Sequence, residues 1–274
     1  MKLLTLRTPN GTQAVRQDGD TLIEIDGYAS VGELLQNPDW KSVAAAATGA
    51  SHAYDGADLA AVVPAPSKII CVGHNYRNHI KEMGREVPQY PTLFAKYAES
   101  LIGPNDDLAL PPESDAVDWE AELAVIIGKP GRRITEADAA DHIAGYAVLN
   151  DVSMRDHQFR TIQWLQGKTW ENSTPFGPAL VTSDEFTAGP LMTSAVDGDI
   201  MQSTPTGDVV FTPEFLVHYI STMITLNPGD VIATGTPGGV GHAREPKVYL
   251  AEGQTLVTTI EGLGTLTNKV IKEV

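Results

Sequence analysis

Three acidic residues in this sequence are suited to hold a metal ion. Glu120 and Glu122 lie two positions apart in residues 118–128, a run that is otherwise mostly apolar. Side chains of a strand alternate between its faces, so both carboxylates would point the same way, about 6.6 Å apart along the chain. Carboxylates this close in an apolar setting repel each other, and a divalent cation removes that conflict. Asp151, which ends the apolar run 145–150, is the expected third ligand.

The chemistry of these ligands limits the choice of metal. No pair of Cys or His residues accompanies them at the spacing of a zinc site. Three carboxylates therefore favour Mg²⁺ or Mn²⁺, and Ca²⁺ would also suit them. The same pattern fits an exposed strand face or an edge strand with inward charges, so the motif alone leaves both interpretations open.

A histidine and a glutamate one helical turn apart form a second candidate group. His79 and Glu82 have the i, i+3 spacing that makes side chains neighbours on a helix. A carboxylate beside an imidazole orients it and stabilises its protonated form, as in a general base that activates water. The spacing also suits a solvent-exposed pair on a surface helix.

Two cations and an amide follow Asp151 closely. Arg155, Gln158 and Lys168 supply hydrogen-bond donors near the expected metal site. In so acidic a chain, basic groups at such a place favour a substrate that carries a carboxylate. Arg155 could equally form a salt bridge with a neighbouring acid such as Asp156.

Residues 234–241 form a glycine-rich segment, Thr-Gly-Thr-Pro-Gly-Gly-Val-Gly. The segment lacks the Lys-Ser/Thr of a P-loop, and its spacing does not match the dinucleotide-binding fingerprint, which argues against a nucleotide site. Its backbone amides could still bind an anionic oxygen.

Short strands between turn signals must position these residues. We expect strands at 68–73, 120–127, 145–150, 179–182, 231–233, 254–260 and 269–271. Helical signals are fewer: a Thr-x-x-Asp cap opens 135–142, and 212–222 is amphipathic with a proline in its first turn. This pattern predicts a β-rich α+β fold rather than a doubly wound parallel sheet.

The N-terminal region, residues 1–64, is expected to be a small α+β domain. It has β-like runs at 2–7 and 21–25 and short helical segments at 31–35 and 40–47. A proline-punctuated segment, 62–67, separates it from the rest. We therefore expect a domain boundary there, with residues 65–274 as the catalytic domain.

Composition excludes several classes of function. The 274 residues carry 19 basic and 35 acidic side chains, a net charge of -16, which argues against nucleic acid and against an anionic membrane surface as partners. The one cysteine, Cys71, cannot form an internal disulfide and lies in an apolar run, where a buried thiol is expected. No apolar stretch approaches the roughly 20 residues of a membrane span, and no signal peptide is expected. The sequence predicts a soluble cytoplasmic protein.

Taken in order, the motifs of this chain resemble those of the fumarylacetoacetate hydrolase family. The resemblance runs from about residue 68 to the C-terminus. The ordered set is specific although each motif is weak, and it comprises residues 71–79 with Glu82, 94–96, 118–129, 144–146, 150–158, 167–168, 177–178, 228–230 and 234–237.

The resemblance implies a roll of mixed β-sheets, usually a homodimer, that holds one Mg²⁺ or Mn²⁺. The family's metal ligands correspond to Glu120, Glu122 and Asp151. Its other functional residues correspond to the water-activating dyad His79 and Glu82, to Lys168 beside the metal, and to the substrate contacts Lys96, Arg155, Gln158 and Thr236. Met154 is a departure, because many members have alanine there.

The function implied is hydrolysis of a C–C bond in an acylpyruvate, a 2,4-diketo acid such as fumarylpyruvate, to pyruvate and a carboxylic acid. His79, oriented by Glu82, would take a proton from water, and the metal would stabilise the pyruvate enolate. Two other reactions suit the same site: decarboxylation of a β-keto acid such as oxaloacetate, and isomerisation of a 2-hydroxyhepta-2,4-diene-1,7-dioate-type acid. An alternative from another class is a non-catalytic β-domain with a structural metal.

Overall fold

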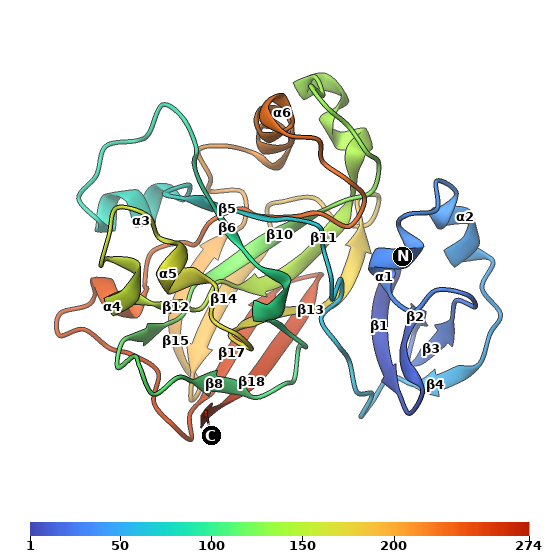
Figure 1. The fold of residues 1–274 in the computed structure, drawn as a ribbon, viewed down its shortest axis with the longest axis horizontal. Coiled ribbons are helices and arrows are strands. Elements are labelled where there is room, and N and C mark those ends of the chain that lie inside the picture. Colours follow the sequence, from blue (N-terminus) through green and yellow to red (C-terminus); the bar gives the residue numbers. More distant parts are fainter. Residues whose placement is uncertain (274) are drawn as a thin grey trace.

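The computed structural model describes residues 1–273 and is rich in strands (Figure 1). Within that range one eleven-stranded sheet has the order β4 (Ser51–Ala53), β3 (Thr21–Glu24), β2 (Gly11–Asp18), β1 (Lys2–Thr8), β13 (Thr174–Thr182), β11 (Ile143–Asn150), β10 (Ala121–Ile127), β16 (Val231–Ala233), β5 (Ile69–Gly73) and β6 (Thr92–Lys96), with β7 (Leu101–Ile102) paired to β13. A five-stranded sheet has the order β15 (Asp199–Pro205), β14 (Leu191–Val196), β17 (Thr255–Ile260), β18 (Gly264–Lys272) and β8 (Leu108–Leu110). The short pair β12 (Ser153–Met154) and β9 (Val117–Asp118) completes the strands.

The helices are short and lie at the ends of these strands. They are α1 (Val31–Leu34), α2 (Trp40–Ala45), α3 (Arg77–Glu82), α4 (Arg155–Gln158), α5 (Leu165–Lys168), α6 (Pro213–Met223) and the 3₁₀ turns η1 (Ala98–Ser100), η2 (Glu136–His142) and η3 (Gly241–Ala243). Figure 1 shows α3, α4 and α5 together on the side of the molecule opposite the N-terminal strands.

The predicted mixed, β-rich architecture is confirmed. Most strand pairs are antiparallel, whereas β16 with β5, β18 with β8 and β13 with β7 are parallel. Every predicted strand exists, although the one expected at 179–182 begins earlier, at Thr174. The helix expected at 135–142 is a 3₁₀ turn, whose cap Thr135 accepts from the Asp138 amide, and Thr212 caps α6 in the same way.

The central strands are apolar because both faces of the sheet are covered. All seven residues of β10 are buried. Leu123 and Val125 point into one core cluster, while Ala124 and Ile126 point into the cluster on the other face. Because side chains alternate along a strand, one continuous apolar run fills two cores, and a charged residue in it must have buried partners.

The N-terminal strands continue the same sheet as the rest of the chain. Strand β1 pairs antiparallel with β13, with Leu3 opposite Leu180. Leu3 and Trp40 also share a core cluster with Cys71 and Leu149. The boundary predicted between residues 64 and 65 therefore lies within a shared sheet and core, and it stays a prediction.

No helix in residues 1–273 is long and apolar enough to cross a membrane.

Candidate active site and metal centre

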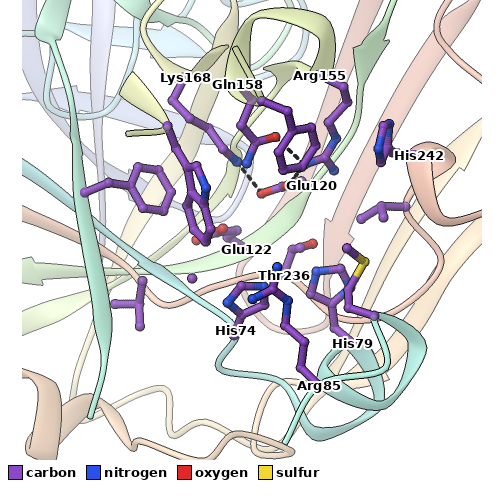
Figure 2. A pocket seen from close by; sticks show the side chains of 17 residues that line it. His74, His79, Arg85, Glu120, Glu122, Arg155, Gln158, Lys168, Thr236 and His242 are labelled. Atoms are coloured by element: carbon purple, nitrogen blue, oxygen red, sulfur yellow. Dashed lines mark hydrogen bonds and ion pairs between the residues drawn. The ribbon is translucent and has the colours of Figure 1, made fainter. Parts of the chain in front are cut away.

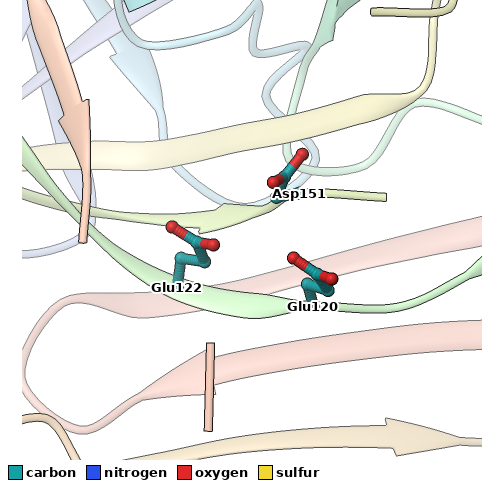
Figure 3. A group of neighbouring side chains, drawn as sticks. All are labelled: Glu120, Glu122 and Asp151. Atoms are coloured by element: carbon teal, nitrogen blue, oxygen red, sulfur yellow. The ribbon is translucent and has the colours of Figure 1, made fainter. Parts of the chain in front are cut away.

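The three acidic residues expected to bind a metal converge in the structure (Figure 3). Glu120 immediately precedes β10, Glu122 lies in it, and Asp151 immediately follows its antiparallel neighbour β11. The Asp151 amide donates to the Glu120 carbonyl at 2.8 Å, which fixes the two strand ends together. One carboxylate oxygen from each residue lies within 4.8 Å of the others, and all three side chains are buried. The exposed strand face left open by the sequence is thereby excluded.

Two lysines lie against this carboxylate triad, which we define as Glu120, Glu122 and Asp151. The Lys168 ammonium donates to Glu120 Oε2 at 2.7 Å and to Asp151 Oδ2 at 2.8 Å. The Lys96 ammonium donates to the other oxygen of Asp151, Oδ1, at 2.8 Å. Lys96 is 2% exposed and does not line the pocket described below, so its contacts are with a candidate ligand and not with the space expected to hold substrate.

The carboxylates of the triad are not electrostatically equivalent. Burial opposes ionisation of Glu120, but Lys168 and Arg155 outweigh it and lower its pKa to about 2. Burial raises the pKa of Glu122 well above its ordinary value, and repulsion from Asp151 and Glu120 adds to the effect. Within residues 1–273, Glu122 has no ion-pair partner and accepts one hydrogen bond, from the Gly235 amide at 2.8 Å.

The donor set fits a hard divalent cation. With Asp118, the buried cluster contains four carboxylates against three cations, so one negative charge is uncompensated. Carboxylate oxygens are the ligands that Mg²⁺ and Mn²⁺ prefer, and a cation beside Glu122 would relieve the repulsion that raises its pKa.

The predicted dyad lies on α3, one helical turn apart. His79 Nδ1 and Glu82 Oε2 are 3.0 Å apart, and His79 is 8% exposed, so the imidazole is buried although Glu82 is exposed. Partial burial opposes ionisation of Glu82, but the hydrogen bonds from His79 and from the Gly239 amide outweigh it and lower its pKa. Since Nδ1 faces Glu82, the second ring nitrogen, Nε2, is the one free to exchange a proton.

The glycine-rich loop 234–241 binds anions that belong to the protein itself. The Gly235 amide donates to Glu122, the Gly239 amide to Glu82, and the Gly241 amide to Asp118 at 2.7 Å. The loop therefore contacts the triad through Glu122, the dyad through Glu82, and also Asp118, the carboxylate that pairs with Arg155. The anion-binding property expected of this loop is present, with carboxylate side chains as the anions.

Arg155 is buried between two acids rather than paired with its neighbour Asp156. Its Nε donates to Asp118 at 2.8 Å, and its Nη1 lies 2.6 Å from Glu120 Oε1 and donates to Gln158 at 2.9 Å. Its remaining nitrogen, Nη2, is buried and has no partner in the described residues. A buried, unpaired N–H donor is costly, which indicates a site built to receive an acceptor.

A single pocket brings the triad and the dyad face to face. Figure 2 shows His79 and Thr236 on one side and Glu120, Lys168, Gln158 and Arg155 on the other. The Thr236 hydroxyl accepts from Gln202 at 2.8 Å, which leaves its own hydrogen available to the pocket. Of the predicted site residues, the pocket is lined by His79, Glu120, Glu122, Arg155, Gln158, Lys168 and Thr236, and not by Glu82, Asp151 or Lys96.

Ten residues that line the pocket were not predicted as site residues from the sequence. His74, Arg85 and His242 line its polar rim, and Phe94 and Trp164 form an aromatic wall with ring centroids 5.5 Å apart. His74 lies inside a motif singled out for His79, and His242 follows the glycine-rich loop, so position was an available signal for both. Phe94 lies in the motif 94–96, which was singled out for Lys96, whereas Trp164 resembles an ordinary core residue that no local pattern distinguishes.

Comparisons with known proteins identify the family of this chain. The family described as "Fumarylacetoacetate (FAA) hydrolase C-terminal" matches residues 68–271. The human protein named mitochondrial oxaloacetate tautomerase FAHD2A is 48% identical over 216 residues, which is 77% of this chain and 68% of that protein. The Xenopus laevis protein named mitochondrial oxaloacetate tautomerase is 41% identical over 93% of this chain and 84% of its own length.

Solved structures share the whole fold. A putative HpcE protein from Mycobacterium smegmatis superimposes with a TM-score of 0.92 at 33% identity, and the match covers all of both chains. The 2-hydroxyhepta-2,4-diene-1,7-dioate isomerase from Mycobacterium marinum has a TM-score of 0.82 at 33% identity, covering 100% of this chain and 99% of that one.

Proposed function

Since this chain belongs to the fumarylacetoacetate hydrolase family and is an enzyme of that family, we propose that it catalyses keto–enol tautomerisation of a 2-oxo dicarboxylic acid of the oxaloacetate type. The observation that carries the proposal is the placement of His79 in one pocket with Glu120 and Glu122, two carboxylates of the buried triad. The names of the relatives, an oxaloacetate tautomerase and a dioate isomerase, support the same chemistry, because both reactions move a proton next to a carbonyl group.

The polar groups around the triad suit a 2-oxo acid. Glu120, Glu122 and Asp151 would hold the cation, which when bound supplies Lewis-acid polarisation of the keto oxygen. The unpartnered Nη2 of Arg155 and the ammonium of Lys168 provide donors beside it for the adjoining carboxylate. Burial makes these charge–charge contacts stronger than they would be in water.

Proton transfer falls to the His79–Glu82 dyad. In the keto-to-enol direction the C3–H bond breaks, its electron pair forms the C2=C3 double bond, and the proton goes to His79 Nε2. The same proton then passes to the C2 oxygen, so the histidine returns to its neutral form. Glu82 holds Nδ1 at 3.0 Å and stabilises the imidazolium between the two transfers.

A second candidate is hydrolysis of an acylpyruvate at a C–C bond. The same dyad favours it, because a carboxylate-oriented imidazole can equally take a proton from water. Decarboxylation of oxaloacetate would use the same substrate position without a water. All three reactions pass through an enolate next to the triad, and they differ in what leaves the third carbon.

A substrate panel tests the proposal. Purified protein with Mg²⁺ or Mn²⁺ is mixed with enol-oxaloacetate, with fumarylpyruvate and with 2-hydroxyhepta-2,4-diene-1,7-dioate, and the enol absorbance and the release of pyruvate are followed. Tautomerisation predicts rapid loss of the oxaloacetate enol without pyruvate. Pyruvate from oxaloacetate would instead show decarboxylation, and pyruvate from fumarylpyruvate would show hydrolysis.

The remaining expectations stay predictions. We propose a homodimer whose ligand is a small anionic keto acid, with no nucleic-acid or membrane partner and with a cytoplasmic location. Light scattering of the purified protein tests the oligomeric state. The net charge of -16 supports the exclusion of nucleic acid.

A further inference from the structure

His74 is a pocket residue to which the reaction above gives no role. It lies one residue after β5 and has a φ of 55°, a left-handed backbone that is uncommon outside glycine. Its imidazole is half-buried, lines the pocket and makes no hydrogen bond within residues 1–273. Strained backbone positions of this kind gather at ligand sites, where the surrounding structure enforces them.

Aromatic neighbours hold the His74 ring in place. The ring lies nearly parallel to that of His79, with centroids 6.3 Å apart and an interplanar angle of 17°. The Trp164 ring packs against the His74 ring in an edge-to-face arrangement, with ring centroids 5.3 Å apart. Trp164 also fills the space beside Gly73, where a Cβ would collide with its ring. These contacts orient His74, but they leave its ring nitrogens without partners.

Arg85 brings a positive charge to the same end of the pocket. Figure 2 shows Arg85, His74 and His79 on the side that faces Glu120 and Lys168. Arg85 lines the pocket, and its guanidinium has no salt bridge with any carboxylate of the described part of the chain. Burial lowers the pKa of His74 to about 4, and repulsion from Arg85 contributes to the shift. At neutral pH His74 is therefore an uncharged donor near the permanent charge of Arg85, whose side chain lines the pocket and is exposed to solvent.

We propose that His74 and Arg85 form a second anion-binding subsite, which holds the carboxylate at the far end of a 2-oxo dicarboxylic acid. This inference rests on the proposed function, because it assumes that the 2-oxo acid end of the substrate lies at the triad. Arg85 supplies the charge and His74 an oriented N–H donor. Monocarboxylic 2-oxo acids would leave both groups without a partner, so the subsite makes the second carboxylate a requirement for tight binding.

Two ligands that differ only in this group give the most direct test. 2-Oxoglutarate and 2-oxopentanoate have the same chain length, and a methyl group replaces the terminal carboxylate in the second. Titration calorimetry of the Mn²⁺-loaded full chain gives the ratio of their dissociation constants without any turnover. We expect the wild type to bind the dicarboxylate at least roughly tenfold more tightly, as hydrogen bonds to a charged group allow.

The variants are chosen to keep the fold. His74→Asn is preferred over an aliphatic replacement because asparagine tolerates a left-handed backbone. Arg85→Gln removes the charge, and Arg77→Gln is its matched control, since Arg77 lies on α3, is exposed and does not line the pocket. We expect H74N and R85Q each to reduce the preference for the dicarboxylate to near unity, whereas R77Q retains it. Thermal unfolding shows which variants are folded, and R85Q carries the test if H74N is not.

The outcomes separate this inference from the proposed function. Loss of the preference in H74N and R85Q supports the subsite even if the wild type turns over no keto acid. An unchanged preference in both folded variants, or equal binding of the two ligands by the wild type, overturns the subsite even if oxaloacetate is tautomerised. For an active enzyme, the same variants should raise KM for oxaloacetate roughly tenfold or more, with a smaller effect on kcat.

Discussion

Glu122 differs from the other two triad carboxylates in forming no ion pair within residues 1–273. Lys168 and Arg155 compensate Glu120, and the two lysines compensate Asp151, but Glu122 accepts only a backbone amide. Its raised pKa records that imbalance, which comes from burial first and from the neighbouring carboxylates second. A buried carboxylate without an ion-pair partner destabilises the metal-free protein, whereas a bound cation makes the same carboxylate stabilising. Glu122 is therefore the residue whose substitution separates the two effects.

The variant Glu122→Gln should change stability in opposite directions with and without metal. In chelator we expect it to exceed the wild type in free energy of unfolding by about 1 kcal/mol or more, because the repulsion is removed while the Gly235 hydrogen bond is kept. With Mg²⁺ at about 100 times its dissociation constant, the wild type should gain about 2.7 kcal/mol and the variant much less. Chemical denaturation under both conditions measures this. Equal metal-dependent gains would show that Glu122 is not a ligand.

His79→Ala should reduce turnover by roughly 10²–10⁴-fold, the usual contribution of a general base. Metal binding, measured by calorimetry, should be unchanged, because His79 makes no hydrogen bond to the triad among the described residues. Turnover at the wild-type rate would exclude this residue as the proton carrier.

The pH dependence of the dyad has a defined sign. The pKa of Glu82 lies below its ordinary value of 4.5, so the Glu82 carboxylate that accepts from His79 is ionised above pH 4.5, and its stabilising effect is lost as the pH falls through the lower, folded-state pKa. Glu82 protonation should therefore cause no loss of kcat above pH 4.5. Glu82→Gln should lower kcat by up to about 10⁴-fold. Any fall of kcat towards acidic pH that the wild type shows above pH 4.5 should remain in the variant. Disappearance of that fall in the variant would contradict the assignment.

At the residue scale, the sequence predicted which local pairs of residues lie together, but it did not predict contacts between residues far apart in the chain. The spacing of Glu120 and Glu122 and of His79 and Glu82 is local, and the structure has both pairs as expected. Lys96 was expected to touch substrate but binds Asp151, 55 positions away, which no local pattern encodes.

Among the elements, the loop 234–241 positions helix α3, which carries the dyad, relative to the triad. Gly239 has a φ of 102° and donates to Glu82, and a Cβ there would collide with the Met201 carbonyl oxygen. Glycine is required at this position for both its backbone and its lack of a side chain. The pairing of α3 with this loop could not be predicted, because the two segments are far apart in sequence, whereas the strand that carries Glu122 could be, from its uninterrupted apolar pattern.

Gly239→Ala should therefore impair catalysis as well as stability. We expect a loss of roughly 1–3 kcal/mol of stability from backbone strain, and a fall in kcat because Glu82 loses its hydrogen bond from the loop. Gly253→Ala is the matched control: its φ is 88° and no atom lies within 4 Å of the added Cβ. The control should lose stability but keep kcat, and equal kcat values in the two variants would show that the loop does not position the dyad.

For the whole molecule, the N-terminal 64 residues complete the sheet that carries the site. Strand β1 covers the edge of β13, whose other neighbour β11 leads to Asp151. The sequence predicted β1, β3 and the two short helices of this region but missed β2 and β4, and its proline-punctuated linker gave no sign that the two parts share a sheet and a core cluster. Sheet pairing across a linker depends on long-range packing, which local turn signals do not report.

A chain consisting of residues 65–274 should be strongly destabilised. Deletion exposes the edge of β13 and removes Leu3 and Trp40 from a shared core, so we expect a Tm lower by about 10 °C or more and a tendency to aggregate. Scanning calorimetry of the full chain should show one cooperative transition. Two separate transitions, or a truncated chain as stable as the full one, would show that the N-terminal region is an independent domain.

The central claim is that the triad and the dyad together tautomerise a 2-oxo dicarboxylic acid, and the initial rate of enol-oxaloacetate loss tests it most directly. The rate is measured with Mg²⁺ alone, with Mg²⁺ and wild-type protein, with chelator added, and with Mg²⁺ and the E122Q or H79A variant. We predict strong acceleration by the wild type only, lost in chelator and in both variants. A wild-type rate equal to that of Mg²⁺ alone would contradict the proposed function.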